Sequence, residues 1–180
     1  ADQNGQWPYQ TDSDEPLLDS REGSFEVGDP PGDAAEFYRV GRLEYTGRPY
    51  LKFREGGYWL KAGADEPENI LGRAFGDWED KRRQVDYLAS RGINSLYVMT
   101  HTLDGDGNDV WPWIGINPEQ AKGFPDRFDL IRLERWRDFF EYLQEKGLVL
   151  YMILEDDSAW TGYDREAYYR EMVARFGDLP

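Results

Sequence analysis

Acidic side chains follow an apolar run near the carboxyl end of the sequence. Residues 148–154 are apolar throughout, and Glu155, Asp156 and Asp157 come directly after them. A strand that is apolar on both faces is typical of a parallel sheet covered on both sides. The C-terminal ends of such strands carry the active sites of barrels and doubly wound sheets. Paired carboxylates there are the groups that glycoside hydrolysis uses.

Neighbouring residues at one strand end point in different directions, so these three acids are not themselves a catalytic pair. We expect Glu155 to be the catalytic or assisting carboxylate, with Asp156 and Trp160 binding substrate. The alternative is an acidic loop that only leads into the helix capped by Asp164.

Polar residues also follow the two strands predicted earlier in the chain. A strand at residues 58–64 is followed by Asp65, Glu66 and Asn69, which we expect to bind sugar hydroxyls. The alternative is a polar loop in which Pro67 starts a short helix. A strand at 93–100 is followed by His101, which either contacts the sugar or is a structural hydrogen-bonding residue.

A loop rich in acids and glycines follows His101. Asp104, Asp106 and Asn108 alternate as oxygen ligands do in a calcium loop, so a calcium site is one prediction. The loop is not an EF-hand, because its sixth position is Asp109 and its twelfth is Gly115. The alternative is a tight turn stabilised by side-chain carboxylates.

Two tryptophans flank a proline in the same long loop. The rings of Trp111 and Trp113 either form a sugar-stacking platform at the rim of a cleft or belong to the core. Their place in a loop beside polar residues favours the platform.

The elements that position these residues repeat along the chain. Apolar residues at three- and four-residue steps predict helices at 77–91, 130–146 and 165–176, ending at Gly92, Gly147 and Gly177. Each helix follows a predicted strand, which gives three β/α units in residues 58–180. We therefore expect an α/β fold that is an incomplete barrel: a fragment, one chain of a split assembly, or a small three-stranded sheet.

The residues before the β/α units are organised differently. Residues 1–35 predict an acidic extended arm with one short strand, and residues 36–57 predict a β-meander. The arm is strongly charged, since residues 1–33 hold nine acids and a single base, Arg21.

Composition narrows the classes of partner. The net charge of −15 argues against nucleic acid and against an anionic membrane surface. The chain has no cysteine, so disulfides and thiolate metal sites are excluded. No apolar run reaches transmembrane length and no signal peptide is present, while a start at Ala1 suits a mature or trimmed product.

Four stretches together resemble one family: residues 58–72, 85–97, 104–113 and 168–177. They are similar to the bacterial glycoside-hydrolase-like TIM-barrel proteins that carry an N-terminal DUF5060 β-domain, distant relatives of the DUF4038 apiosidase-like barrels. The resemblance covers roughly residues 36–180. Its most specific part is the block from Asp104 to Trp113, which reads Asp-Gly-Asp-Gly-Asn-Asp-Val-Trp-Pro-Trp.

The resemblance implies that the chain is the N-terminal portion of a (β/α)8 TIM barrel, about three β/α units, preceded by a short β-meander. It also implies a sugar cleft at the C-terminal face and a secreted or periplasmic protein. In such barrels the acid/base glutamate ends strand 4 and a second carboxylate ends strand 7. Both positions lie beyond the part of the barrel that this chain covers, so neither role is carried over to a residue here.

The expected function is that of a glycoside-hydrolase-like protein acting on a polysaccharide or oligosaccharide. This chain would supply the first barrel strands and part of the cleft, and a second chain or segment would complete the barrel. One alternative is a non-catalytic carbohydrate-binding protein that stacks sugars on Trp111, Trp113 and Trp160. Another is a structural or assembly subunit whose open sheet edge recruits another chain.

Overall fold

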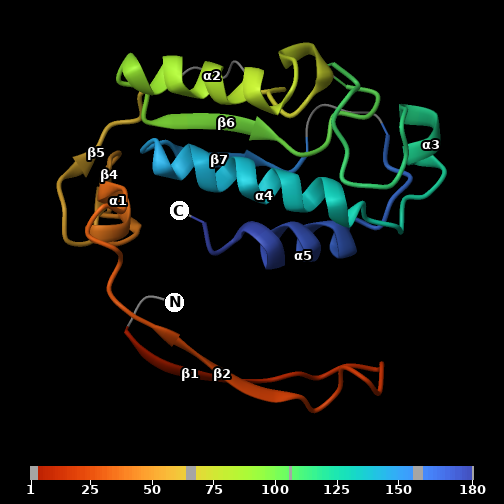
Figure 1. Ribbon diagram of the computed structural model, residues 1–180, viewed down its shortest axis with the longest axis horizontal. Coiled ribbons are helices and arrows are strands. Elements are labelled where there is room, and N and C mark those ends of the chain that lie inside the picture. The colour runs from red at the N-terminus through yellow and green to blue at the C-terminus, as the bar shows by residue number, and fades with distance from the viewer. Residues whose placement is uncertain (1–3, 64–67, 106, 156–159, 180) are drawn as a thin grey trace.

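The computed structural model describes residues 4–63, 68–105, 107–155 and 160–179. The described residues form a mixed α/β structure with three small sheets, ordered β1-β2, β3-β4-β5 and β6-β7 (Figure 1). In chain order the elements are β1 Gly5–Gln10, β2 Glu22–Val27, α1 Glu36–Arg39, β3 Leu43–Tyr45, β4 Leu51–Phe53, β5 Tyr58–Trp59, the 3-10 helix η1 Arg73–Phe75, α2 Trp78–Ser90, β6 Ser95–Met99, α3 Pro118–Lys122, α4 Leu130–Glu145, β7 Val149–Ile153 and α5 Arg165–Phe176.

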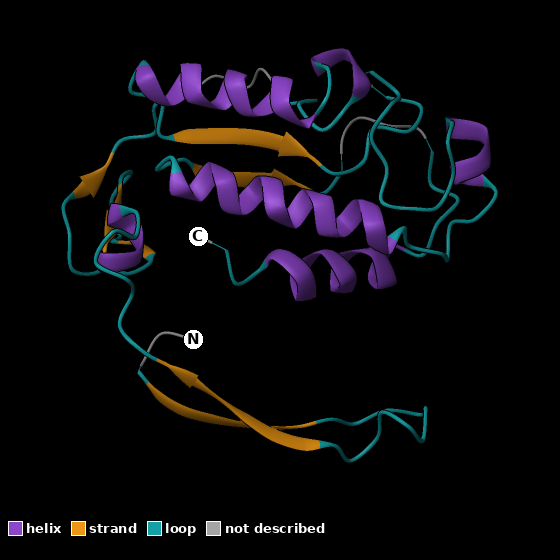
Figure 2. Cartoon of the chain, in the orientation of Figure 1, coloured by secondary structure: helices purple, strands orange, loops and turns teal. Residues whose placement is uncertain are grey.

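The centre of the structure is the parallel pair β6 and β7. Their register runs from Ser95 opposite Val149 to Met99 opposite Ile153. The connection between the two strands contains α3 and α4, and α2, α4 and α5 lie alongside the strands (Figure 2). Leu96, Val98 and Leu148 are almost fully buried in the core with apolar residues of the three helices. The parallel strands predicted at 93–100 and 148–154 are therefore present as β6 and β7. Strand β6 is largely buried as expected, whereas β7 is partly exposed, with Tyr151 at 50%.

The helix boundaries follow from their caps. Asp77 begins α2 with a reciprocal capping box to Asp80, and Asp164 caps α5 by accepting from the Ala167 amide at 3.0 Å. Gly92 and Gly147 adopt φ of +81° and +79°, the left-handed conformation that favours glycine after a helix. These predictions are confirmed.

Of the strand predicted at residues 58–64, the described part is a strand at Tyr58 and Trp59, while residues 60–63 form no strand. Tyr58 and Trp59 form β5, which pairs antiparallel with β4 of the meander, because the turn at Gly56-Gly57 folds the chain back. The chain then runs beside β6: the Asn94 amide donates to the Ala62 carbonyl at 2.8 Å, and the Asn94 side chain accepts from the Ala62 amide at 2.7 Å.

The meander predicted at residues 36–57 is wrong at its start, because Glu36–Arg39 form the single helical turn α1 and not a strand. A strand would place Phe37 and Arg39 on the same face. The helical turn buries Phe37, which is 6% exposed, and leaves Arg39 in solvent. The rest of the predicted meander is present as β3 and β4, and β5 extends this sheet past residue 57.

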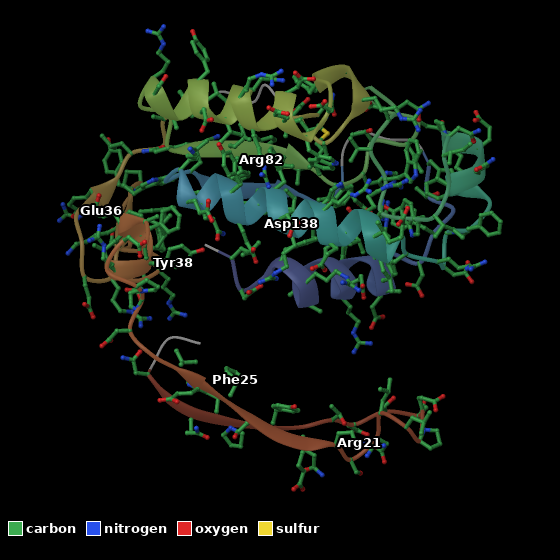
Figure 3. All side chains as sticks on the ribbon, in the orientation of Figure 1. Arg21, Phe25, Glu36, Tyr38, Arg82 and Asp138 are labelled. Atoms are coloured by element: carbon green, nitrogen blue, oxygen red, sulfur yellow. The ribbon has the colours of Figure 1, made fainter. Side chains whose placement is uncertain are left out.

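The acidic arm forms a two-stranded ribbon instead of an extended segment with one short strand. Strands β1 and β2 pair antiparallel, with Trp7 opposite Phe25. In Figure 1 the ribbon runs apart from the helical layers, and Phe25 is labelled on it in Figure 3. Trp7, Tyr9 and Phe25 share one face of the ribbon and are exposed.

Within the part of the chain that the structure describes, none of the helices is both long and apolar enough to span a bilayer.

Candidate functional site

The C-terminal ends of β6 and β7 bring two predicted site residues to the same edge. Thr100 and His101 follow β6, while Leu154 and Glu155 follow β7. The strands are parallel, and the pairing continues past them, since the Thr100 amide donates to the Ile153 carbonyl at 3.1 Å. His101 and Glu155 therefore emerge on one rim.

An aromatic cluster gathers around His101 at this rim. The imidazole lies edge-on to four aromatic rings, with centroid distances between 5.0 and 6.1 Å; the rings are those of Trp113, Trp160, Tyr163 and Tyr168. Trp113 and Trp160 also contact each other at 5.3 Å. The predicted residues His101, Trp113 and Trp160 are thus brought together by the fold.

The aromatic cluster has a buried floor and a partly exposed upper layer. His101, Trp113 and Tyr168 are at most 1% exposed, whereas Trp160 and Tyr163 are half-buried. The Nδ1 atom of His101 accepts a hydrogen bond from the Leu103 amide at 3.1 Å, so the neutral ring carries its proton on Nε2. This burial favours the structural alternative for His101 over a direct contact with sugar, because the imidazole lies in the buried layer of the aromatic cluster.

Glu155 lies at the exposed side of the aromatic cluster, with its side chain 26% exposed. Its Oε1 accepts a hydrogen bond from the Tyr163 hydroxyl and pairs with Nε of Arg165 at 2.8 Å. Burial by itself would raise the pKa of Glu155, but hydrogen bonds from Tyr163 and Tyr169 and the charge of Arg165 outweigh it, so the pKa is lowered. Glu155 is therefore ionised at neutral pH.

An ionised carboxylate can accept hydroxyl protons or stabilise positive charge, but it is not a general acid, which needs a raised pKa. Burial and the neighbouring Glu155 raise the pKa of Tyr163, so this phenol stays protonated and remains a donor. The rim therefore carries one hydrogen-bond acceptor, the Glu155 carboxylate, beside two partly exposed aromatic rings, those of Tyr163 and Trp160.

Tyr168 is a site residue that the sequence reasoning missed. The buried residues of α5 are Tyr168, Met172 and Phe176. Val173 is 62% exposed. The four-residue spacing from Tyr168 to Phe176 is the signal that distinguishes the buried face.

The Trp-Pro-Trp segment is held as part of the core. Trp111 is 3% exposed, and the guanidinium groups of Arg73 and Arg132 lie over its ring, 5.9 and 5.1 Å from the centroid. Arg132 donates to the carbonyls of Trp111, Trp113 and Gly115 at 2.7–2.9 Å. Trp111 and Trp113, at 3% and 0% exposed, are therefore core residues, which is the second of the two interpretations. The expected stacking platform at the rim is wrong for both tryptophans.

Asp109 is a second residue whose role the sequence did not reveal. Its Oδ2 accepts from the Arg73 amide at 2.6 Å at the start of η1. A Cβ at Gly72 would lie 2.3–2.6 Å from the Asp109 carboxylate, so the close approach requires glycine there. Asp109 thus ties the acidic loop to the segment before α2.

The acidic loop has the geometry of the turn alternative in its described part. Oδ1 of Asn108 accepts from the Asp104 amide at 3.0 Å, and Asp104 forms an ion pair with Lys122. The Asn108 side chain thus stabilises the turn, and the Asp104 carboxylate is paired with Lys122. Asp106, the third predicted calcium ligand, lies outside the described residues, within which no cluster of three or more acidic, histidine or cysteine side chains has metal-binding geometry.

The remaining predicted residues divide into two groups. Asp65, Glu66 and Asp156 lie outside the described residues. Asn69 is half-buried in a turn whose carbonyl accepts from the Gly72 amide at 2.7 Å, and its side chain lies beside Gly107 of the acidic loop. The contacts of Asn69 are therefore with that loop.

No family model matches this sequence, and a comparison with curated proteins found no match. Among solved structures, the chain is similar to the 1.80 Å crystal structure of "a putative glycoside hydrolase from Bacteroides vulgatus ATCC 8482", with a TM-score of 0.63 and 17% identity. The similarity covers 96% of this chain and 34% of that protein, so the chain spans about a third of its length. At this identity the likeness concerns the fold, and the chain has a fold of the kind found in a glycoside-hydrolase-like protein.

Proposed function

We propose that this chain supplies part of the sugar cleft of a glycoside-hydrolase-like protein acting on a polysaccharide. The observation that supports it best is the rim at the ends of β6 and β7, where ionised Glu155 lies beside the half-buried rings of Trp160 and Tyr163. Carboxylates that accept hydroxyl protons beside aromatic faces suit a sugar, which has polar edges and apolar C–H faces.

In this proposal Glu155 binds or orients the substrate, or stabilises charge, and does not protonate the leaving group. Its described partners are Tyr163, Tyr169 and Arg165, all of which favour the ionised form. Hydrolysis needs two carboxyl groups that flank the bond, about 5–9.5 Å apart. The acid would therefore come from polypeptide beyond the described residues.

We further propose that the chain forms the first three units of a (β/α)8 barrel. The face of β6 and β7 that points away from their core contacts carries Tyr97 and Tyr151, whose rings stack at 5.0 Å and 8°. Lys61 lies 5.2–5.3 Å from both ring centroids. A large aromatic such as Tyr151, 50% exposed on this face, supports the idea that further strands would cover it.

Activity of the whole protein on a panel of polysaccharides tests the proposal. We expect Glu155→Gln to lower kcat/KM at least tenfold, because it removes a charge from the cleft while keeping the shape. Glu166→Gln is the matched control, since Glu166 is exposed on the first turn of α5 and forms only a surface ion pair with Arg170. Turnover of Glu155→Gln at the wild-type rate would remove this residue from the site.

A non-catalytic carbohydrate-binding role is the second candidate. The observation that favours it is the ion pair between Arg165 Nε and Glu155 Oε1 at 2.8 Å. The arginine balances the negative charge of the carboxylate, which stays ionised and can accept hydrogen bonds. Calorimetric binding of an oligosaccharide, combined with the absence of any released sugar after long incubation, would support the binder over the enzyme.

A further inference from the structure

The hydroxyl of Tyr168 bridges the ends of the two central strands. It lies 2.6 Å from Oγ1 of Thr100, which follows β6, and donates to the Leu154 carbonyl, which follows β7, at 2.6 Å. The Leu154 carbonyl can only accept, so it takes the phenol proton. The single proton of the Thr100 hydroxyl is then shared between the phenol oxygen at 2.6 Å and the Ile153 carbonyl at 3.2 Å, and the shorter contact makes the phenol oxygen its main acceptor. One buried side chain of α5 thus fixes both strand ends.

We propose that Tyr168 is a positioning residue, which holds His101 and Glu155 in the geometry of the candidate site. His101 directly follows Thr100, and Glu155 directly follows Leu154, so each site residue is the neighbour of a Tyr168 partner. The use of this geometry for sugars rests on the proposed function, whereas the positioning itself does not.

The hydroxyl, and not only the ring, is needed for this role. The ring packs against Trp113 and Tyr163 at 5.7 and 5.5 Å, contacts that a phenylalanine would retain. A buried hydroxyl is costly unless it is hydrogen-bonded. Tyr168 is fully buried, burial raises the pKa of its phenol, and both of its hydrogen-bonding directions are used. The packing of the Tyr168 ring does not require the phenol oxygen.

The spectroscopic readout is simple, because His101 is the single histidine of the chain. Its imidazole ¹H–¹⁵N signals need no further assignment, and the nitrogen shifts distinguish protonated from unprotonated Nδ1. We expect one set of signals in the wild type, with Nδ1 unprotonated because it accepts from Leu103. Tyr168→Phe should shift or split this set as the His101 strand end loses its anchor.

The matched control is Tyr142→Phe, which also removes one phenol hydroxyl. That hydroxyl donates to Asp86 at 2.7 Å on the exposed side of α4 and α2. We expect this variant to lose some thermal stability and to keep the wild-type imidazole signals. Tyr168→Phe with unchanged imidazole signals would show a purely structural role and overturn the proposal.

A second pair of variants covers the case in which Tyr168→Phe does not fold. Thr100→Val removes the other hydroxyl of the bridge and keeps the side-chain shape, so it should shift or split the same signals. Thr100→Ser restores a hydroxyl and should return them to the wild-type pattern. Unaltered signals in Thr100→Val would overturn the proposal. These readouts need no ligand, so the absence of sugar binding would contradict the proposed function and leave the positioning role intact.

Discussion

The Tyr163 hydroxyl donates a hydrogen bond to Oε1 of Glu155, across the loop that joins β7 to α5. Tyr163 also contacts the His101 ring at a centroid distance of 5.0 Å. This tyrosine therefore links the carboxylate at the end of β7 to the histidine at the end of β6. Together with the Tyr168 hydroxyl, it joins the two strand ends at the candidate site.

Removing the Tyr163 hydroxyl should weaken folding in a pH-dependent manner. In the folded protein the pKa of Glu155 lies below the ordinary value of a glutamate. The stabilisation from its ionised form is therefore present above that ordinary pKa and is lost as the pH falls through the folded pKa. We expect Tyr163→Phe to cost about 1 kcal/mol of unfolding free energy at pH 7. Urea denaturation at pH 7 and pH 3 measures the difference.

The control for this experiment is Tyr45→Phe, because Tyr45 is 74% exposed on the meander. That variant should match the wild type at both pH values. An equal loss for Tyr163→Phe at pH 7 and pH 3 would show that the ionised Glu155 does not carry the stabilisation.

Gly72→Ala should destabilise the protein because of the Asp109 carboxylate. The added Cβ would lie 2.3–2.6 Å from its atoms, and the carboxylate is held by the Arg73 amide. Overpacking of this kind costs about 1–3 kcal/mol. Gly32→Ala is the control, since no atom lies within 4 Å of its Cβ. Equal denaturation midpoints for the two variants would contradict the close approach of Asp109.

Arg132→Lys should loosen the Trp-Pro-Trp segment although the charge is kept. The guanidinium of Arg132 donates hydrogen bonds to three carbonyls at once, and a lysine ammonium cannot reproduce this planar arrangement of donors. We expect a loss of about 2 kcal/mol in unfolding free energy. Arg135→Lys, on the exposed side of the same helix, should change stability little. Similar values for the two variants would mean that the three carbonyls do not depend on Arg132.

Deleting residues 1–33 should leave the rest of the fold intact. The β1–β2 ribbon is exposed along its length, and an isolated two-stranded ribbon adds little stability of its own. We expect the truncated protein to unfold within a few degrees of the full chain, by circular dichroism. A loss of cooperative unfolding would mean that the ribbon stabilises the α/β layers.

The sequence was most informative where local chemistry determines the structure. The Asp77 cap, the left-handed Gly92 and Gly147, and the apolar runs of β6 and β7 each follow from short patterns, and all are present. The α1 turn was not predictable, because a four-residue helix has no periodicity and is decided by the burial of Phe37.

The site was predicted only in part, for a related reason. A strand-end position identifies His101 and Glu155, and the fold brings them to Tyr163. Whether a loop tryptophan is exposed depends on distant partners, and Trp111 is buried in the core cluster with the guanidinium groups of Arg73 and Arg132 over its ring. Those contacts join residues far apart in the sequence, so no local sequence pattern predicts them.

Calorimetric titration of an oligosaccharide panel into the protein tests the sugar cleft most directly. We predict that at least one oligosaccharide binds, and that Glu155→Gln weakens this binding about tenfold, or roughly 1.4 kcal/mol, while Glu166→Gln does not. Wild-type affinity in Glu155→Gln, or no binding of any sugar by a folded protein, would contradict a carbohydrate site at the ends of β6 and β7.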